Sequence, residues 1–501
     1  MSPSFDLVHE PWIPCIDLDG NFVALGILDT LEWSHRLRSL HDPSPLVTVS
    51  LHRLLLAVLH RVFGPKSADA WYKLWRREHW PIEPLTEYLS RQNGFDLFHP
   101  TRPFYQAEDP RVSPKSVIHL IHSSANNPTL FSHETEITGI SLTPAQAARS
   151  LVAAQSFRLG GLSGLDQKFT DAPLARGVVF LAQGDTLFET LALNLLRYPD
   201  DSVFPTDEDD KPAWEMDDPF WPERSRPLGY LDYLTWQTTR IRLFPEEGPN
   251  GVVVCEATIA PALRLASDVR DPMKHYSKRK KGIHLLSFVK ERALWRDYHT
   301  LLELDSASDN EHPPAVFNWI ATLARLGYIP PEHRYLCSAL GMATRPGQDK
   351  VFFYRHQQMP LPLEYLQERD LAAQITSAIR LADEVDRCLN SSLITFAELV
   401  IVPDADQEHR PRPAKEESIN LVNHWGVRSH YWNDLEPAFW QLVETLPANP
   451  EAAAEQWRST LKQAARRSFE HAETLTGSTV DALKGAVRGR RQLEAGIAKL
   501  L

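Results

Sequence analysis

The chain has 501 residues, enough for about two to four domains and at least one large hydrophobic core. Its net charge of -12 argues against a protein that coats nucleic acid non-specifically, so any polyanion would have to meet local basic patches. Four scattered cysteines without a CxxC pair argue against a disulfide framework and against a thiolate zinc site, and they favour a reducing compartment.

The N-terminal region shows no targeting signal and predicts a small β-structure. No basic region followed by an apolar region opens the chain, and no apolar run approaches the length of a membrane span. We therefore expect a soluble cytoplasmic protein with no membrane partner. Residues 5–25 alternate apolar pieces with turn signals and predict a hairpin anchored by Trp12. A helical apolar stripe begins at Leu51.

Residues 123–133 form a polar stretch with two apolar residues, Leu130 and Phe131. An exposed loop with one aromatic residue at its tip is a common design for stacking on a nucleotide. The alternative is that Phe131 folds back into the core. Both interpretations remain open from the residues alone.

A helix with a clear start runs into a glycine-rich stretch. Thr143 can cap this helix, Pro144 suits its first position, and Gln146 completes a capping box. The sequence therefore predicts that the following loop begins at a defined helix end.

Three glycines, Gly160, Gly161 and Gly164, follow within a few residues of that helix, and Arg158 and Lys168 flank them with positive charge. Glycine removes the Cβ atoms that keep a ligand at a distance, and it leaves backbone N–H groups free to face phosphates. The alternative is that Gly160 merely ends the helix as its C-cap.

The middle of the chain predicts further elements and one basic run. We expect a helix over residues 185–198, a solvated acidic loop over 200–218 and helices near 295–304 and 314–326. Strands are expected over residues 233–243 and 251–259, which are rich in β-branched and aromatic residues.

Five basic residues and no acid lie within residues 274–281, starting at Lys274. This pattern favours a phosphate contact, because like charges repel unless a counter-surface is near; a solvated surface run is the alternative. Later, the Pro346-Gly347 pair would present Gln348 near the tip of a tight turn. Glutamine can reach base edges there, or it can simply face solvent.

After residue 360 the pattern becomes helical to the end of the chain. Apolar residues at three-four spacing predict a long helix over residues 371–396, and further helices are expected near 434–446, from Pro450, and from Ser478. We therefore predict an α+β protein with a large mixed N-terminal domain over residues 1–360 and a C-terminal four-helix bundle over residues 361–501.

The motifs of common enzymes are absent from the sequence. Residues 161–165 come near a nucleophile elbow but lack its final glycine, and a helix precedes them. The glycines match neither a Walker loop nor a dinucleotide-binding loop, and no histidine cluster has metal-ligand spacing. We expect no catalytic residue, no enzymatic activity, no metal and no cofactor.

Several stretches in this order resemble the CasA family, whose members are the large subunit of the type I-E CRISPR surveillance complex, Cascade. The resemblance spans the whole chain, including the predicted bundle. It rests on the glycine loop together with EPWIP at residues 10–14, FDLFHPTRPFYQ at 95–106, YLTW at 233–236, DPMK at 271–274 and LWRDY at 294–298.

The resemblance implies a non-catalytic subunit that recognises the protospacer-adjacent motif (PAM) as double-stranded DNA, helps to start R-loop formation and helps to recruit the helicase-nuclease. Expected partners are the other Cascade subunits, the crRNA 5′ handle, target DNA and that helicase-nuclease. Guide RNA pairing would then carry sequence recognition. Some family members carry a four-cysteine zinc site, which this chain cannot form because it lacks the CxxC pairs.

The family resemblance also assigns roles to the candidate residues. Gly160, Gly161 and Gly164 resemble the loop that approaches the PAM minor groove, and Gln348 resembles the glutamine of the strand-separating wedge. Lys274 is a candidate for contact with the DNA backbone. The residues that resemble the loop directed toward the crRNA handle and the PAM are Asn127, Phe131 and His133.

Two other function classes remain as alternatives. A pure assembly scaffold would bind protein partners without reading DNA, and crosslinking of duplex DNA to the glycine loop would exclude it. A hydrolase with an unfamiliar site would show metal-dependent nuclease activity in the purified chain.

Overall fold

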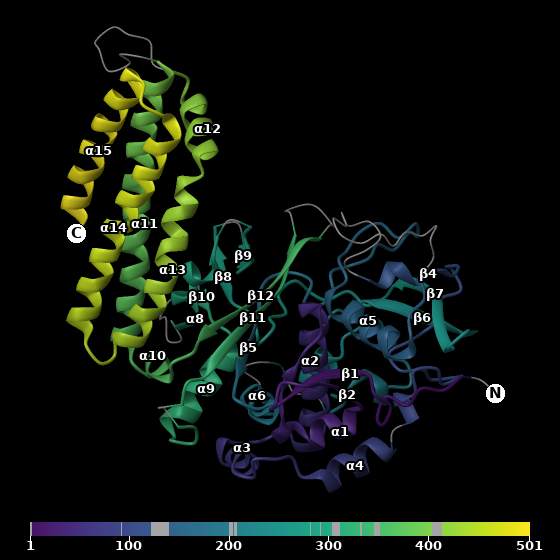
Figure 1. Cartoon of the computed structure of the whole chain (residues 1–501). Helices are drawn as coiled ribbons and strands as arrows, with labels where there is room; N and C mark the ends of the chain where they lie inside the picture. Colours follow the sequence, from purple (N-terminus) through teal and green to yellow (C-terminus); the bar gives the residue numbers. More distant parts are fainter. Residues whose placement is uncertain are drawn as a thin grey trace. The chain divides into compact units, whose positions relative to one another are not determined.

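The computed structural model describes residues 3–91, 93–121, 140–199, 204, 208–280, 282–290, 292–302, 311–330, 333–344, 351–402 and 413–501, with only the backbone of 93, 351 and 352. Helices and strands are mixed through the chain, as predicted, and are coloured along the sequence in Figure 1. Contacts between residues divide the chain into two compact units. The first consists of Met1–Lys290 and Leu304–Leu363, and the second of Glu291–Glu303 and Glu364–Leu501.

The first unit begins with the predicted hairpin. Strand β1 (Ile13–Asp17) pairs antiparallel with β2 (Phe22–Leu25) on one side and with β3 (Leu37–Leu40) on the other. Trp12 is fully buried, and its indole N–H donates to the Leu7 carbonyl at 2.9 Å. Trp12 therefore anchors the hairpin, as expected.

Helix α2 (Pro45–Phe63) lies in the core of this unit and begins before the apolar stripe that predicted it. By length and composition it is apolar enough to cross a membrane, so the expectation that no apolar run reaches that length was wrong. However, 78% of its apolar window is buried inside the protein. Burial on all sides is typical of a core helix.

Three further antiparallel sheets belong to the first unit, each of three strands. Their strand orders are β12-β11-β5, β4-β7-β6 and β10-β8-β9. The strands are β4 (Lys115–Ser116), β5 (Val179–Gln183), β6 (Thr239–Gly248), β7 (Gly251–Pro261), β8 (Tyr276–Arg279), β9 (Gly282–Leu285), β10 (Glu311–His312), β11 (Leu336–Thr344) and β12 (Val351–Pro360).

The first unit also has further helical segments. They are α1 (Ile27–Glu32), η1 (Ser34–Arg36), α3 (Ala68–Trp75), α4 (Ile82–Arg91), η2 (Asn93–Phe95), η3 (Val117–Leu120), α5 (Pro144–Phe157), α6 (Leu187–Leu193), η4 (Ala213–Glu215), α7 (Tyr230–Leu234) and α9 (Ala315–Arg325). Helix α6 is shorter than predicted.

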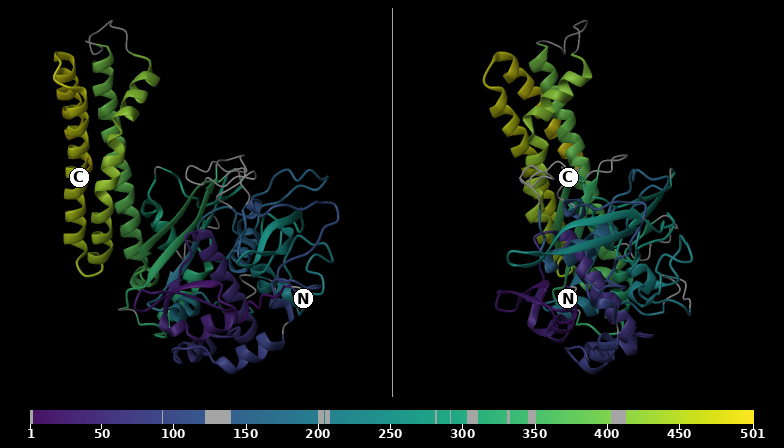
Figure 2. Two further views of the ribbon diagram at one scale, coloured as in Figure 1. Left: turned by 45° about the vertical axis from the view of Figure 1, so that its right-hand side comes forward. Right: turned by 90° about the vertical axis from the view of Figure 1, so that its right-hand side faces the viewer.

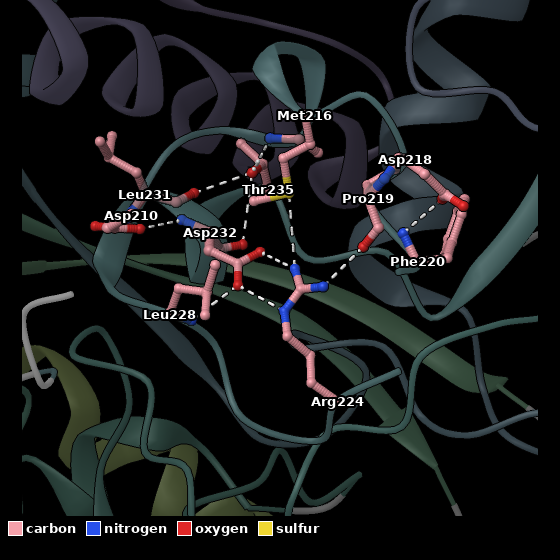
Figure 3. A network of polar contacts seen from close by, with 11 residues as sticks. Asp210, Met216, Asp218, Pro219, Phe220, Arg224, Leu228, Leu231, Asp232 and Thr235 are labelled. Carbon is pink, nitrogen blue, oxygen red and sulfur yellow. Dashed lines mark hydrogen bonds and ion pairs between the residues drawn. The ribbon is translucent and has the colours of Figure 1, made fainter. Parts of the chain in front are cut away.

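Two predictions in the middle of the chain were wrong in part for a shared reason, although residues 239–243 do form a strand, in β6. The predicted strand over residues 233–243 begins as helix α7, and the predicted solvated loop carries Asp210 and Trp214, which are only 7% and 6% exposed. The Asp210 carboxylate accepts the backbone N–H groups of Leu231 and Asp232 at 3.1 and 2.9 Å, in the first turn of α7 (Figure 3). This long-range cap has no local sequence pattern.

The second unit is helical, and Figure 2 shows its long helices side by side. Helix α11 packs against α12, α14 and α15, and α13 packs against α14. Residues 295–304, predicted as helical, contribute only short pieces, and α12 was not predicted. The elements are η5 (Leu294–Asp297), α8 (His299–Leu302), α10 (Leu363–Gln367, at the boundary), α11 (Arg369–Ile401), α12 (Lys415–Trp425), α13 (Val427–Thr445), α14 (Pro450–Thr476) and α15 (Val480–Leu500).

Glycines let α15 approach its neighbours closely. A Cβ atom built on Gly489 would lie 2.8 Å from the Phe469 ring and 2.9 Å from the Ser392 carbonyl oxygen. A Cβ atom on Gly485 would lie 2.8 Å from the Phe396 ring. A side chain at these positions would force α15 away from α11 and α14.

Candidate nucleic-acid interface

Helix α5 leads into the glycine loop through the predicted capping box. The Thr143 hydroxyl accepts the Gln146 N–H at 3.3 Å, and the Gln146 side chain accepts the Thr143 N–H at 2.9 Å. The helix ends at Phe157 with Arg158 as its C-cap. Because Gly160 comes two residues later, the alternative in which Gly160 is the C-cap was wrong.

The glycine loop, defined here as residues 158–172, closes on itself near its base. Gly161 and Phe169 exchange two backbone hydrogen bonds of 3.2 and 3.0 Å, and the Gly160 N–H donates to the Asp171 carboxylate at 2.8 Å. A Cβ atom on Gly160 would lie 3.1 Å from the Phe169 carbonyl oxygen. The first two glycines therefore allow two backbone segments to lie against each other.

The tip of the glycine loop exposes alternate residues. Leu162 is 85% exposed, and Gly164, Asp166 and Lys168 are also exposed. Gly164 has a φ of +79°, and a Cβ atom there would meet nothing within 4 Å. The tip thus presents the backbone of Gly164 to open space, flanked by the exposed side chains of Leu162, Asp166 and Lys168.

Arg158 ties the base of the glycine loop to the chain before residues 122–139. Its guanidinium lies over the Phe169 ring at 4.6 Å and donates to the His119 carbonyl at 3.4 Å. Burial lowers the pKa of Arg158 to about 10. The predicted contact residues Asn127, Phe131 and His133 lie outside the described residues, but their segment starts three residues after His119.

Arg176 ties the glycine loop to the end of strand β11. Its Nε donates to the Asp171 carboxylate at 2.9 Å, and its Nη1 donates to the Thr344 hydroxyl at 2.6 Å. Asp171 also accepts the Gly160 N–H. A chain of hydrogen bonds, called the relay below, therefore runs from Gly160 through Asp171 and Arg176 to Thr344. Gln348 lies outside the described residues, in the segment that starts directly after Thr344.

Lys274 lies inside the protein, although the sequence suggested a contact with the DNA backbone. It is 3% exposed, and its ammonium donates to the carbonyls of Pro173 and Arg176, both at 2.7 Å. Burial lowers the pKa of Lys274 to about 8, against the opposing effect of Asp271. A buried ammonium cannot reach a phosphate, so Lys274 supports the Arg176 turn from within.

The rest of the basic run forms an exposed hairpin of strands β8 and β9. Lys278, Arg279 and Lys280 are exposed there. The base of the hairpin joins the turn that carries Arg176, because the Val178 N–H donates to the Leu286 carbonyl at 2.8 Å. The run is therefore split between one buried lysine and a solvated basic tip.

A buried ion pair holds the segment that carries Lys274. Arg53 of α2 pairs with Asp271, and the Tyr233 hydroxyl donates to the same carboxylate at 2.7 Å. Burial alone would raise the pKa of Asp271, but Arg53 and Lys274 outweigh it and lower this pKa. Sequence reasoning missed Arg53, whose position between apolar residues of a core helix was the available signal for a buried partner.

Within the described residues, one group of two carboxylates and a histidine lies close enough together to hold a metal ion. Ligand atoms of Asp185, Glu189 and His333 lie within 4.8 Å of one another. The Glu189 carboxylate, however, already accepts the backbone N–H groups of Asp185 and Thr186 at 2.6 and 3.4 Å as part of a helix cap. A structural role for Glu189 accounts for this group.

The CRISPR-associated protein Cse1 family model matches residues 6–468. This chain belongs to the Cse1 family. A curated CasA/Cse1 protein from Thermus thermophilus is 33% identical to it over 511 residues, covering 97% of this chain and 96% of the relative. The crystal structure of CasA from Thermus thermophilus superimposes with a TM-score of 0.81 at 29% identity, covering 99% of this chain and 100% of that one.

A chain of a structure described as a CRISPR RNA-guided surveillance complex shares the fold of this chain. Its TM-score is 0.76 at 23% identity, covering 98% of this chain and 100% of that one. The resemblance to the CasA family, first inferred from scattered motifs, is thereby confirmed.

Proposed function

We propose that this chain is the non-catalytic large subunit of a type I-E CRISPR surveillance complex, where it recognises the PAM in double-stranded target DNA. Strand separation, R-loop formation and recruitment of the helicase-nuclease would follow from this recognition. Two findings support the proposal: the chain belongs to the Cse1 family, and a chain with the same fold occurs in an RNA-guided surveillance complex. The other subunits and the crRNA 5′ handle would be its further partners.

The exposed tip of the glycine loop is the observation that carries the DNA-reading part of the proposal. The minor groove of B-DNA is only about 6 Å wide and displays a degenerate pattern of donors and acceptors. Backbone without side chains can enter where bulky residues would clash. Gly164 provides such backbone, since nothing surrounds the position of its missing Cβ atom.

The relay beneath the glycine loop supports a shared role for distant segments. Arg158 contacts the chain shortly before residues 122–139, and Arg176 contacts the chain just before residues 345–350. We propose that Asn127, Phe131 and His133 act from the first segment, and that Gln348 acts as the wedge from the second. Opening of a base step costs a few kcal/mol, so the wedge needs additional binding energy.

Exposed basic residues near the glycine loop can supply that binding energy through phosphate contacts. In place of Lys274, we assign this role to Lys168 at the loop tip and to Lys278, Arg279 and Lys280 on the β8–β9 hairpin, because all four are exposed. Local positive charge of this kind is compatible with the overall net charge of -12.

A matched pair of substitutions at Gly164 tests the proposal. Asparagine and aspartate have nearly the same shape, and both tolerate a left-handed backbone better than other residues. In the reconstituted complex, Gly164→Asp should weaken PAM-dependent target binding about 10-fold, because it adds a negative charge next to DNA, and Gly164→Asn should weaken it less. Binding is measured with a PAM library by mobility shift, and subunit assembly by size-exclusion chromatography.

If both variants assemble and bind targets like the unmodified complex, the loop tip does not enter the groove. The alternative function, an assembly scaffold that does not read DNA, would then account for the family resemblance.

A further inference from the structure

A cavity of about 520 Å³ lies in the first unit, away from the tip of the glycine loop. It is bordered by residues 100–108, residues 213–220 and the outward face of strand β6. Pockets of about 300–1,000 Å³ typically hold small ligands or parts of larger ones. None of the roles proposed above uses this cavity.

The wall formed by residues 218–220 is held in place by a polar network (Figure 3). The Arg224 guanidinium donates to the Asp232 carboxylate at 2.7 Å and to the Pro219 carbonyl at 3.0 Å. The Phe220 N–H donates to the Asp218 carboxylate at 2.9 Å. The wall is therefore organised before any ligand arrives, which reduces the entropy lost on binding.

Aromatic side chains form another part of the lining. The rings of Phe104 and Tyr105 stack at 4.4 Å, and Trp214 lies 5.9 Å from Tyr105. Tyr105 has a φ of +55°, a backbone conformation that is unfavourable for a bulky residue. Strain of this kind is concentrated at functional sites.

Gln237 supplies a polar group that the protein itself does not satisfy. The residue is 4% exposed and lines the cavity. Its side-chain amide makes no hydrogen bond to any of the described residues. Its amide is therefore available to the cavity, and a ligand that offers a donor and an acceptor side by side could pair with it. The edge of a nucleobase offers this pattern.

Arginines on strand β6 supply positive charge. Arg240 lies over the Phe220 ring at 4.4 Å and donates to the Pro261 carbonyl at 3.1 Å. Arg242, two residues later, has the 73% exposed Glu108 as its partner at 3.5 Å. Three arginines and three acids line the cavity in all, so its net charge is near zero; they are Arg102, Arg240, Arg242, Glu108, Asp217 and Asp218.

The segment 261–263 links the cavity to the glycine loop. Its first carbonyl, Pro261, accepts from Arg240, and its second, Ala262, accepts from the Gln167 side chain of the glycine loop at 2.9 Å. Phe220 of the cavity wall packs against Ala262 and Leu263. The cavity and the glycine loop thus share one backbone segment.

We infer that this cavity binds one unpaired nucleotide, with the base against the aromatic lining, its edge on Gln237 and its phosphate near Arg240 and Arg242. Trp221, next to the wall residue Phe220, is 76% exposed and offers a stacking surface to a neighbouring base. The inference relies on the proposed function only for the source of the nucleotide, a strand opened beside the glycine loop. A free nucleotide has the same chemistry and is the other source to be tested.

Binding by the purified full-length chain tests the inference without the rest of the complex. The probe is a fluorescent single-stranded hexanucleotide, compared with the same probe lacking its bases. Gln237→Met removes the amide but keeps the size of the side chain, and it should fold normally because no hydrogen bond within the described protein is lost. We expect it to weaken hexanucleotide binding roughly 10-fold or more, and the base-free probe to bind equally weakly to both proteins.

Arg240→Gln should also weaken binding roughly 10-fold, whereas Arg458→Gln on α14 should change it little, although both remove one positive charge. If a nucleoside monophosphate competes with the hexanucleotide for binding, the cavity binds free nucleotides. If it does not compete, the cavity binds a nucleotide within a strand. Equal binding of the hexanucleotide by wild type and Gln237→Met, or equal binding of the base-free probe by wild type, would overturn the inference. Either result is independent of PAM-dependent binding by the complex.

Discussion

Glycine serves opposite purposes in the two units of this protein. In the glycine loop, Gly164 lies at an exposed tip with nothing around the position of its Cβ atom. In helix α15, Gly489 lies against a ring and a carbonyl that leave no room for a Cβ atom. The first glycine leaves backbone open to a partner, and the second brings two helices together.

The comparison shows that the neighbours of a glycine, and not its frequency, determine what it does. Gly160 is intermediate, because it is half-buried, packed against Phe169 and hydrogen bonded to Asp171. A substitution at Gly160 would disturb the loop as well as any ligand. Gly164 is therefore the better position at which to separate DNA binding from folding.

The largest expected effect is at Gly489. Leucine has a higher helix propensity than glycine by about 1 kcal/mol, but the overpacking against Phe469 and Ser392 should destabilise the second unit by about 3 kcal/mol. The cost of overpacking should exceed the gain in helix propensity, so Gly489→Leu should lower the melting temperature and speed amide exchange in α15. The control is Ala495→Leu on the exposed face of the same helix. Equal stability of the two variants would show that α15 does not depend on this close approach.

The next effect concerns buried polar groups in the first unit. His60 on α2 is 1% exposed, and neither of its ring nitrogens has a hydrogen-bond partner within the described chain. Burial lowers the pKa of His60 from 6.5 to about 3. Between these values the unfolded state binds more protons, so stability due to His60 is present above pH 6.5 and is lost as the pH falls toward 3.

At pH 5 this loss should reach about 2 kcal/mol, and His60→Leu should remove it. The measurement is amide exchange in α2 at pH 7 and pH 5, after correction for the intrinsic rates. His424→Leu, on the exposed surface of α12 in the second unit, is the control for the loss of a histidine as such. The same acid dependence in wild type and His60→Leu would show that His60 is not the responsible group.

The smallest effect is expected at the relay under the glycine loop. Arg176→Lys keeps the charge, but a single ammonium cannot reproduce the forked contacts with Asp171 and Thr344. If the proposed function holds, R-loop formation on duplex targets should fall by about 3- to 10-fold, equivalent to roughly 1 kcal/mol. Targets with strands already separated next to the PAM should be bound almost normally.

Thr344→Val removes the other end of the same relay and should show the same pattern to a lesser degree. An equal loss on duplex and pre-opened targets, for either variant, would mean that the relay maintains the fold without coupling groove contact to strand opening.

Local signals in the sequence were sufficient for some elements of the fold. The capping box at Thr143, the hairpin anchored by Trp12 and the helix that starts at Pro450 were all predicted, because each depends on residues close together in the chain. Helix α7 was not predicted, since its first turn is capped by Asp210, some twenty residues earlier. Pairs of this kind cannot be read from periodicity.

The sequence predicted a loop at the glycines but not the residues that hold this loop in place. The glycines predicted a loop after the helix, and five basic residues among the eight of 274–281 suggested a phosphate contact. The fold instead buries Lys274 and exposes Lys278, because the side chain of Lys274 is needed by two backbone carbonyls far away in sequence. Asp171 and Arg176 gave no local signal, since their importance comes from Gly160 and Thr344.

The short segment Glu291–Glu303 has a consequence for any attempt to shorten this protein. Although it precedes the last strands of the first unit, it belongs to the second unit, where Trp295 stacks on Phe439 at 4.6 Å. A chain cut after Leu363 would keep Trp295 but lose the helices that cover it. The exposed indole would then favour aggregation, so the boundary that looks simple along the sequence is not a safe place to divide the molecule.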